Sequence, residues 1–192
     1  QEDDIETRRS IGYLPENNPL YGDLLVKEYL SFVADLRSMP HNIRKENTER
    51  TVAETGLEEV FYRPINQLSK GYRQRVGLAQ AILHRPSILI MDEPTSSLSQ
   101  GEVDRLFEVI GQLKDSGVSV IYISHRLGEV KILADRVSVL RDGENAGVLD
   151  RADISHDRMV QMMVGRDVSQ YYNHTPHQTD DVVMAVENLR TS

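Results

Sequence analysis

The spacing of hydrophobic residues changes several times along the chain. Between residues 26 and 36, and again between residues 69 and 85, apolar residues recur at every third or fourth position, which predicts amphipathic helices. A weaker pattern predicts another helix at residues 45–55. Pro40 and Pro86 follow the first and last of these segments and end them. We therefore expect an all-helical region at residues 24–85.

Short continuous apolar runs flank this region, and helix patterns separate the later runs. Segments of five or six mainly apolar residues are too short for a helix and indicate strands that are buried on both faces. Ser99 and Glu102 have the spacing of a capping box, which predicts that a helix begins there. Strands that alternate with helices predict an α/β fold with a parallel sheet covered by helices. The expected strands are residues 11–15, 87–91, 118–123 and 136–140, and the expected helices between them are residues 99–116 and 127–133.

The last fifty residues have another pattern. Asp142-Gly143 predicts a hairpin turn, and residues 157–164 predict a short helix rich in methionine. Residues 166–181 are polar, as in a linker, and the apolar residues 182–186 then predict a new strand. We therefore expect one domain at residues 1–165, with its strand-rich core at 86–141, a linker at 166–181, and the first strand of a following domain at 182–192.

Composition narrows the possible classes of protein. The 192 residues include 22 Lys and Arg against 30 Asp and Glu, for a net charge of −8, and no cysteine. Disulfide scaffolds, cysteine zinc clusters and thiol catalysis are therefore excluded, and the acidic balance argues against nucleic-acid binding. No apolar run approaches the roughly 18 residues of a membrane span. Because the chain opens with a polar segment and no methionine, we expect it to come from the middle of a longer protein.

Two acidic residues follow the apolar run at 88–91, namely Asp92 and Glu93. Ligands of open α/β sheets bind at the carboxyl ends of the strands, where these carboxylates are expected to lie. One carboxylate can hold a hydrated Mg²⁺ ion while its neighbour orients or deprotonates a water molecule. The alternative is a charged strand end at the surface without any catalytic role.

Besides this pair, two further segments contain residues that could bind phosphate or take part in catalysis. Residues 68–75 (LSKGYRQR) start a helix with Ser69 and Gly71, and the free N–H groups of such a helix start favour phosphate. The alternative is a simple helix cap with solvated arginines. His125 follows the next apolar run, at residues 118–123, and a single histidine is more often structural than catalytic.

Together these segments resemble the ATP-binding cassette (ABC) ATPases, a P-loop NTPase-like family. Residues 68–72 (LSKGY) resemble the signature motif of the family, and residues 88–93 (ILIMDE) resemble its Walker B strand with the catalytic glutamate. Residues 94–98 (PTSSL) resemble the loop that follows, and Ser124-His125 resembles the switch histidine. The motifs keep the order and spacing of the family, and the resemblance covers about residues 8–165.

The resemblance implies a role for each matching residue. Glu93 would be the general base, and His125 would sense the γ-phosphate of ATP. Asp92 would hold Mg²⁺ through water. Glu16 stands at the position of the family's Q-loop glutamine, but an ionised carboxylate cannot donate a hydrogen bond. The signature residues that would contact ATP on an opposing cassette are Ser69, Lys70, Gly71 and Gln74.

The resemblance also implies ATP and Mg²⁺ as cofactors, and a second cassette and a transmembrane permease as partners. Such a protein would lie at the cytoplasmic face of a membrane, in a bacterium. No G-x-x-x-x-G-K-[ST] phosphate-binding loop (Walker A) occurs in the 192 residues, and the family places this loop upstream of the motifs seen here. The chain is therefore expected to be truncated before that loop and inactive on its own.

Different segments resemble different branches of the family. Residues 13–16 (YLPE) and 68–76 resemble exporter and gliding-type (ABC-2) ATPases. Residues 91–99, 122–126 (YISHR) and 162–166 (MMVGR) resemble simple-sugar import ATPases of the ribose, xylose and galactose type, which have tandem cassettes. We therefore expect either a mosaic protein or an assembly that joins two genes near residues 92–95.

The expected function is that of an ATP-binding subunit that couples ATP hydrolysis to transport, with a simple sugar as the cargo. The alternatives are an exporter-type ATPase, a soluble ABC ATPase without a transport role, and a catalytically silent protein that only binds a partner. Residues 24–85 would provide the surface that docks on the permease.

Overall fold

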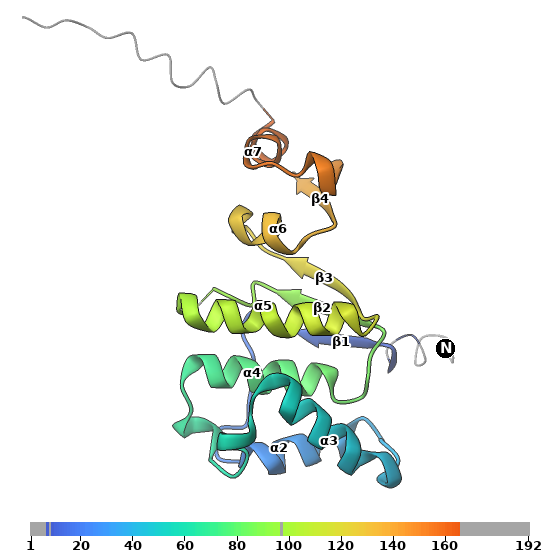
Figure 1. The fold of residues 1–192 in the computed structure, drawn as a ribbon, viewed down its shortest axis with the longest axis vertical. Coiled ribbons are helices and arrows are strands. Elements are labelled where there is room, and N and C mark those ends of the chain that lie inside the picture. Colours follow the sequence, from blue (N-terminus) through green and yellow to red (C-terminus); the bar gives the residue numbers. More distant parts are fainter. Residues whose placement is uncertain (1–6, 8, 97, 166–192) are drawn as a thin grey trace, which may run out of the picture. The chain divides into compact units, whose positions relative to one another are not determined.

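The computed structural model describes residue 7 and residues 9–96 and 98–165. The expected linker at 166–181 and the expected strand at 182–192 lie outside the described residues. The described residues form two compact units, divided between Asp135 and Arg136, which are described separately below (Figure 1). In the part of the chain that the structure describes, no helix is both long and apolar enough to cross a membrane.

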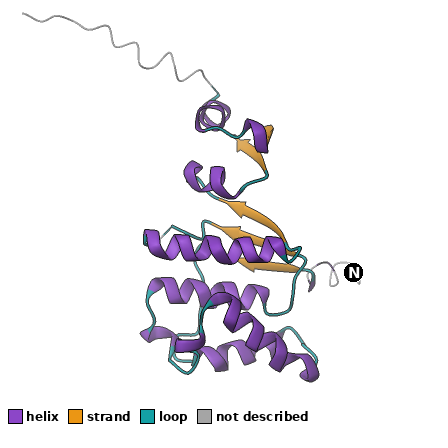
Figure 2. Cartoon of the chain, in the orientation of Figure 1, coloured by secondary structure: helices purple, strands orange, loops and turns teal. Residues whose placement is uncertain are grey.

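The first unit is built on a parallel sheet of three strands, in the order β1-β2-β3 (Figure 2). The strands are β1 (Ile11–Leu14), β2 (Ile88–Asp92) and β3 (Ser119–Ile123). Leu14 lies opposite Met91, and Asp92 lies opposite Ile123, so the three strands end at the same edge of the sheet. This arrangement confirms the predicted α/β fold with a parallel sheet.

Helices fill the long connection between β1 and β2, as the sequence predicts. They are α2 (Val26–Leu36), α3 (His41–Thr55) and α4 (Lys70–Ile82), with short 3₁₀ turns η1 (Glu58–Val60) and η2 (Ile65–Gln67) between α3 and α4. Apolar side chains from α2, α3, α4 and the 3₁₀ turns form one buried cluster, which includes Leu30, Leu57 and Val76.

Helix α3 begins four residues before the predicted start at residue 45. Pro40 is its N-cap, and the helix begins directly after it. Several of its buried side chains are polar, among them Asn47 and Thr55. Asn47 donates a hydrogen bond from Nδ2 to the carbonyl oxygen of Leu83 at 3.2 Å, and Thr55 donates from Oγ1 to its own helix. Because polar residues occupy these inner positions, the apolar spacing underestimates the helix.

Helix α5 (Gln100–Asp115) connects β2 to β3, and its start and end follow the sequence prediction. Ser99 and Glu102 form the capping box, and Gly117 takes a left-handed conformation (φ 91°) after the helix. The apolar face of α5 packs with the buried residues of β2, Leu89 and Met91, in a second buried cluster. This cluster fixes the strand whose end carries the acidic pair.

Strand β3 differs from its prediction as a strand buried on both faces. It is an edge strand, and the side chains of Ile121 and Ile123 are 51% and 47% exposed. Helix α6 (Leu127–Leu133), which follows β3, has no buried residue. The apolar residues predicted the strand correctly. They could not show that, among the described residues, β3 pairs with one strand only and so lies at an edge of the sheet.

The second unit is an antiparallel hairpin followed by a helix. Strands β4 (Arg136–Arg141) and β5 (Glu144–Asp150) pair across a turn at Asp142 and Gly143, which both have positive φ. The turn η3 (Arg151–Asp153) and helix α7 (His156–Val164) follow, and Met159 of α7 is fully buried. Residues 136–140 thus form the expected strand, but its partner among the described residues is antiparallel and not parallel as expected. The predicted hairpin turn at Asp142-Gly143 is confirmed, but the extent of β5 was not predicted, because its polar residues and Gly147 break the alternation.

Candidate functional site

The acidic pair lies where the central strand of the sheet ends. Strand β2 pairs with β1 on one side and β3 on the other, and Asp92 is its last residue and is half-buried. Glu93 follows with φ 42°, a left-handed conformation that residues other than glycine seldom adopt. Its backbone N–H donates to the carbonyl oxygen of Ile123 at 3.0 Å, which ties this turn to the end of β3.

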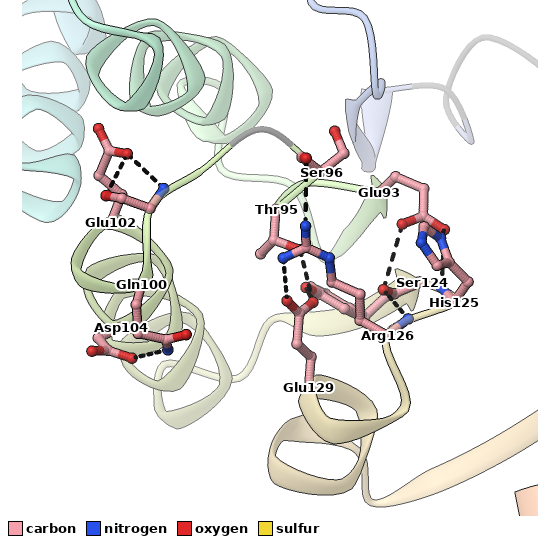
Figure 3. A network of polar contacts seen from close by, with 12 residues as sticks. Glu93, Thr95, Ser96, Gln100, Glu102, Asp104, Ser124, His125, Arg126 and Glu129 are labelled. Atoms are coloured by element: carbon pink, nitrogen blue, oxygen red, sulfur yellow. Dashed lines mark hydrogen bonds and ion pairs between the residues drawn. The ribbon is translucent and has the colours of Figure 1, made fainter. Parts of the chain in front are cut away.

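The Glu93 side chain is held by the loop that follows β3 (Figure 3). Its Oε1 lies 2.8 Å from Nδ1 of His125 and accepts a hydrogen bond of 3.0 Å from the His125 backbone N–H. Its Oε2 accepts a longer hydrogen bond, at 3.5 Å, from Oγ of Ser124. The Glu93 side chain is 17% exposed, whereas the His125 side chain is 72% exposed. The fold thus brings together two residues that are 32 positions apart and presents the imidazole to solvent.

The predicted signature residues form a second group, at the start of α4. Ser69 is the N-cap, and its Oγ accepts a hydrogen bond of 3.2 Å from the Tyr72 backbone N–H. Ser69 and Lys70 are exposed, and Gln74 is half-buried on the same helix. Gly71 is buried, because the carboxylate of Glu102 on α5 occupies the space that a Cβ at this position would need.

The contact between Gly71 and Glu102 shows the electrostatic character of this helix start. Hydrogen bonds from the backbone N–H and the hydroxyl of Ser99 hold the pKa of the Glu102 carboxyl below its ordinary value. The Gly71 backbone and the charge of Arg75 add to the same shift in pKa. The start of α4 therefore already attracts an anionic oxygen, as a phosphate-binding helix start would. Glu102 would have to move before another anion could reach the Gly71 N–H.

Glu16, at the predicted Q-loop position, is exposed in the loop after β1. Because β1 and β2 run parallel and Leu14 lies opposite Met91, this loop leaves the sheet at the same edge as Asp92 and Glu93. The edge therefore collects the loops after β1, β2 and β3.

The carboxylates at this edge of the sheet fit a magnesium ion only if water and phosphate oxygens complete its coordination. Among the described residues, no group of three or more His, Asp or Glu side chains could hold a metal alone. Mg²⁺ keeps several waters and binds proteins through one or two carboxylates together with phosphates of the substrate. A single half-buried carboxylate at Asp92 fits that pattern of ligands.

A cavity of about 330 Å³ lies away from these residues. Its lining includes Arg50 of α3, Arg85, and Leu113 and Gly117 near the end of α5. None of the predicted site residues lines it.

Sequence reasoning missed one residue near this site, Glu129 of α6. Its side chain is 12% exposed and accepts hydrogen bonds from residues on both sides of the Glu93–His125 contact. Nothing in the local pattern distinguished it from an ordinary surface glutamate on a short helix.

Comparison with known protein families matches residues 1–96, half of the chain, to the family described as "ABC transporter". The chain belongs to this family. The match includes the signature segment and the acidic pair, and the resemblance based on the motifs is therefore confirmed.

Relatives and solved structures of the ABC transporter family agree with this assignment. The chain is 46% identical over 127 residues to a ribose import ATP-binding protein of Burkholderia cenocepacia, and 32% identical over 185 residues to a xylose import ATP-binding protein of Escherichia coli. These alignments cover 65% and 95% of this chain. The chain spans only 25% and 36% of the length of those two relatives.

The fold is also that of solved ABC cassettes. The structure of cbiO1 from Clostridium perfringens, part of the ABC transporter complex cbiONQ, superposes with a TM-score of 0.73 at 24% sequence identity, over 89% of this chain and 69% of that one. A dimeric bacterial ABC transporter cassette, MJ0796, gives a TM-score of 0.67 at 23% identity, over 79% of this chain and 68% of that one. At these identities the likeness shows the fold alone.

Proposed function

We propose that this chain is the part of an ABC ATPase that carries the signature and Walker B motifs and the switch histidine. In the full-length protein it would bind ATP with Mg²⁺, hydrolyse the ATP, and couple this to the import of a simple sugar. The observation that carries the proposal is the contact between Glu93 and His125 at the carboxyl end of β2. The import role is supported by the relatives named for ribose, xylose and galactose import.

Glu93 is the proposed general base, and its two oxygens have different surroundings. Oε1 is occupied by the backbone N–H and the ring of His125, whereas Oε2 has only the 3.5 Å hydrogen bond from Ser124. Oε2 is therefore the oxygen that can accept a hydrogen bond, and then the proton, from an attacking water. His125 keeps the carboxylate in place, and its exposed ring can reach a phosphate oxygen.

Asp92 and the start of α4 supply the remaining groups. Asp92 would hold Mg²⁺ through water, and the metal would neutralise charge on the phosphates when it is bound. Ser69, Lys70, Gly71 and Gln74 would contact ATP that is held by an opposing cassette. A second cassette and a membrane permease are therefore the proposed partners, at the cytoplasmic face of the membrane.

The test compares Glu93→Gln with the unchanged full-length protein that carries this sequence, in vesicles that contain its permease. Because glutamine cannot accept the proton of the water, we expect ATP hydrolysis to fall by about 10²–10⁴-fold while ATP binding persists. Uptake of labelled ribose, xylose or galactose should fall with it.

Glu108→Gln is the matched control, because Glu108 is an exposed glutamate on α5 outside the site. It should leave both rates unchanged. Unchanged ATP hydrolysis in Glu93→Gln would rule out the assignment of Glu93, and hydrolysis without uptake of any of the three sugars would rule out the proposed cargo.

A further inference from the structure

The carboxylate of Glu129 joins three segments of the first unit. Its Oε2 accepts a hydrogen bond of 2.8 Å from Oγ1 of Thr95 and one of 2.7 Å from the hydroxyl of Tyr122. Its Oε1 accepts a hydrogen bond of 3.3 Å from Nη1 of Arg126. The donors come from the loop after β2, from β3 itself, and from the residue before α6 (Figure 3).

These contacts offset the cost of burying a charged group. A carboxylate that is removed from water is costly unless hydrogen bonds replace those it made with water. Glu129 has three such donors, and Thr95 is fully buried. The Tyr122 hydroxyl carries its proton at neutral pH and can donate, and burial and the hydrogen bond to Glu129 raise its pKa further above the ordinary value. The Glu129 carboxylate is therefore held by donors from three segments and not by Arg126 alone.

The network holds both sides of the Glu93–His125 contact. Thr95 is two residues after Glu93, and Arg126 directly follows His125. Arg126 also donates from Nη2 to the carbonyl oxygen of Ser96 at 3.4 Å, which links the loop after β2 to the loop after β3 a second time. Hydrogen bonds thus connect the loop after β2 to the loop after β3 on the side of the Glu93–His125 contact nearest α6.

Ser124 adds a connection to the carboxylate of Glu93 itself. Its Oγ accepts a hydrogen bond of 3.0 Å from the Arg126 backbone N–H and donates to Oε2 of Glu93 at 3.5 Å. A displacement of Arg126 would therefore change the position of the oxygen that we assign to the attacking water.

We propose that Glu129 is a positioning residue that keeps Glu93 and His125 in register by tying the loop after β2 to the loop after β3. The inference rests on the proposed function, because it concerns the geometry of that same site. Glu129 acts through Thr95, Tyr122 and Arg126 and reaches neither Glu93 nor His125 itself. Its loss should therefore impair turnover more than the binding of ATP.

The kinetic test uses Glu129→Gln and Glu129→Ala in the full-length protein, with Glu108→Gln as the matched control. Glutamine keeps the shape but replaces one acceptor oxygen with a donor, so at least one of the three hydrogen bonds is lost. We expect kcat for ATP hydrolysis to fall by at least about tenfold, while KM for ATP stays within about twofold. The control should keep both values.

A second measurement does not depend on activity. Hydrogen exchange on the 192-residue chain should show faster exchange of the His125 N–H in Glu129→Gln, because that N–H donates to Glu93. Exchange within α5 should stay unchanged, which separates a local effect from a general loss of stability. Unchanged exchange at His125 would overturn the inference even if Glu129→Ala failed to fold.

The outcomes separate the two proposals. If the unchanged protein does not hydrolyse ATP, or if Glu93→Gln remains active, the proposed function fails. If the unchanged protein is active and Glu93→Gln is not, but Glu129→Gln keeps its kcat, only the role of Glu129 is overturned. A higher KM with an unchanged kcat would also overturn it.

Discussion

Glu93 takes a left-handed backbone conformation that costs a residue with a side chain about 1–3 kcal/mol. Glycine would avoid that cost but could not supply a carboxylate. The backbone N–H of Glu93 donates to Ile123, and its carboxylate accepts from the His125 backbone, contacts the His125 ring and accepts from Ser124, so four polar contacts to the end of β3 and its loop offset the strain. This combination is typical of functional sites and independently supports the choice of Glu93 as the reactive residue.

A second residue-scale prediction concerns His84, which follows α4. Its Nε2 lies 3.1 Å from the carbonyl oxygen of Ile11 and 3.2 Å from Nη1 of Arg37. Burial, and then the charge of Arg37, lowers the pKa of His84 from 6.5 to about 4. Between these two pH values the unfolded chain binds a proton at His84 and the folded chain does not, so stability falls as the pH falls from 6.5 to 4.

Denaturant unfolding at several pH values would test this. We expect His84→Gln to lose less stability than the unchanged chain between pH 6.5 and 4, and the two curves should run parallel above pH 7. His156→Gln is the control, because His156 is exposed on α7. Parallel curves for His84→Gln and the unchanged chain across the whole range would contradict the proposed burial of a neutral histidine.

The residues of the site differ in how far the sequence could predict them. The proximity of Glu93 and His125 could be expected, because each follows an apolar run and neighbouring parallel strands end at the same edge. Glu102 was predicted as a helix cap, but its contact with Gly71 depends on how α4 and α5 pack. Glu129 gave no signal, because its donors lie in segments that only the fold brings together.

At the scale of elements, the close contact between β1 and α4 depends on glycine at position 12, which has no side chain. A Cβ at Gly12 would overlap the carbonyl oxygen of Ala81 and would also press on Pro86. The carbonyl belongs to the helix backbone and cannot rotate away. We therefore expect Gly12→Ala to lower the free energy of unfolding by about 1–3 kcal/mol, as overpacking does.

Gly111 provides a control of opposite sign. It lies inside α5, and a Cβ there would meet no atom within 4 Å. Because alanine favours the helix more than glycine does, Gly111→Ala should raise the free energy of unfolding by about 0.5–1 kcal/mol. Urea unfolding of both variants tests the pair, and a neutral Gly12→Ala would show that β1 can move away from α4.

Local pattern predicted the elements better than it predicted their neighbours. Helices α5 and α6 begin and end within about a residue of the expected limits, and α4 begins within one residue of its expected start, because caps and apolar spacing are encoded in the segment itself. Helix α4 ends at Ile82, three residues before the expected limit at residue 85. The exposure of β3 and the extent of β5 were not predicted, although the hairpin turn after β4 was. Strand pairing is a property of the whole sheet, and an apolar strand has the same sequence pattern at an edge as at the centre.

At the scale of the whole molecule, each of the two units has buried residues of its own. In the first unit, the fully buried Leu89 lies in the cluster between the sheet and its helices. In the second, Met159 of α7 is buried, and α7 packs on the hairpin of β4 and β5. A unit with its own core can lose stability without its neighbour.

Truncating each core residue tests this independence. Leu89→Ala and Met159→Ala each remove a buried side chain, which typically lowers the local free energy of unfolding by about 2–5 kcal/mol. We expect Leu89→Ala to speed hydrogen exchange in β1, β2 and α5, and Met159→Ala to speed it in β4, β5 and α7 only. Each variant serves as the control for the other. Faster exchange in both units from either substitution would show that the two units unfold as one. Effects confined to one unit would mean that residues 1–135 keep the site intact when the hairpin of β4 and β5 opens.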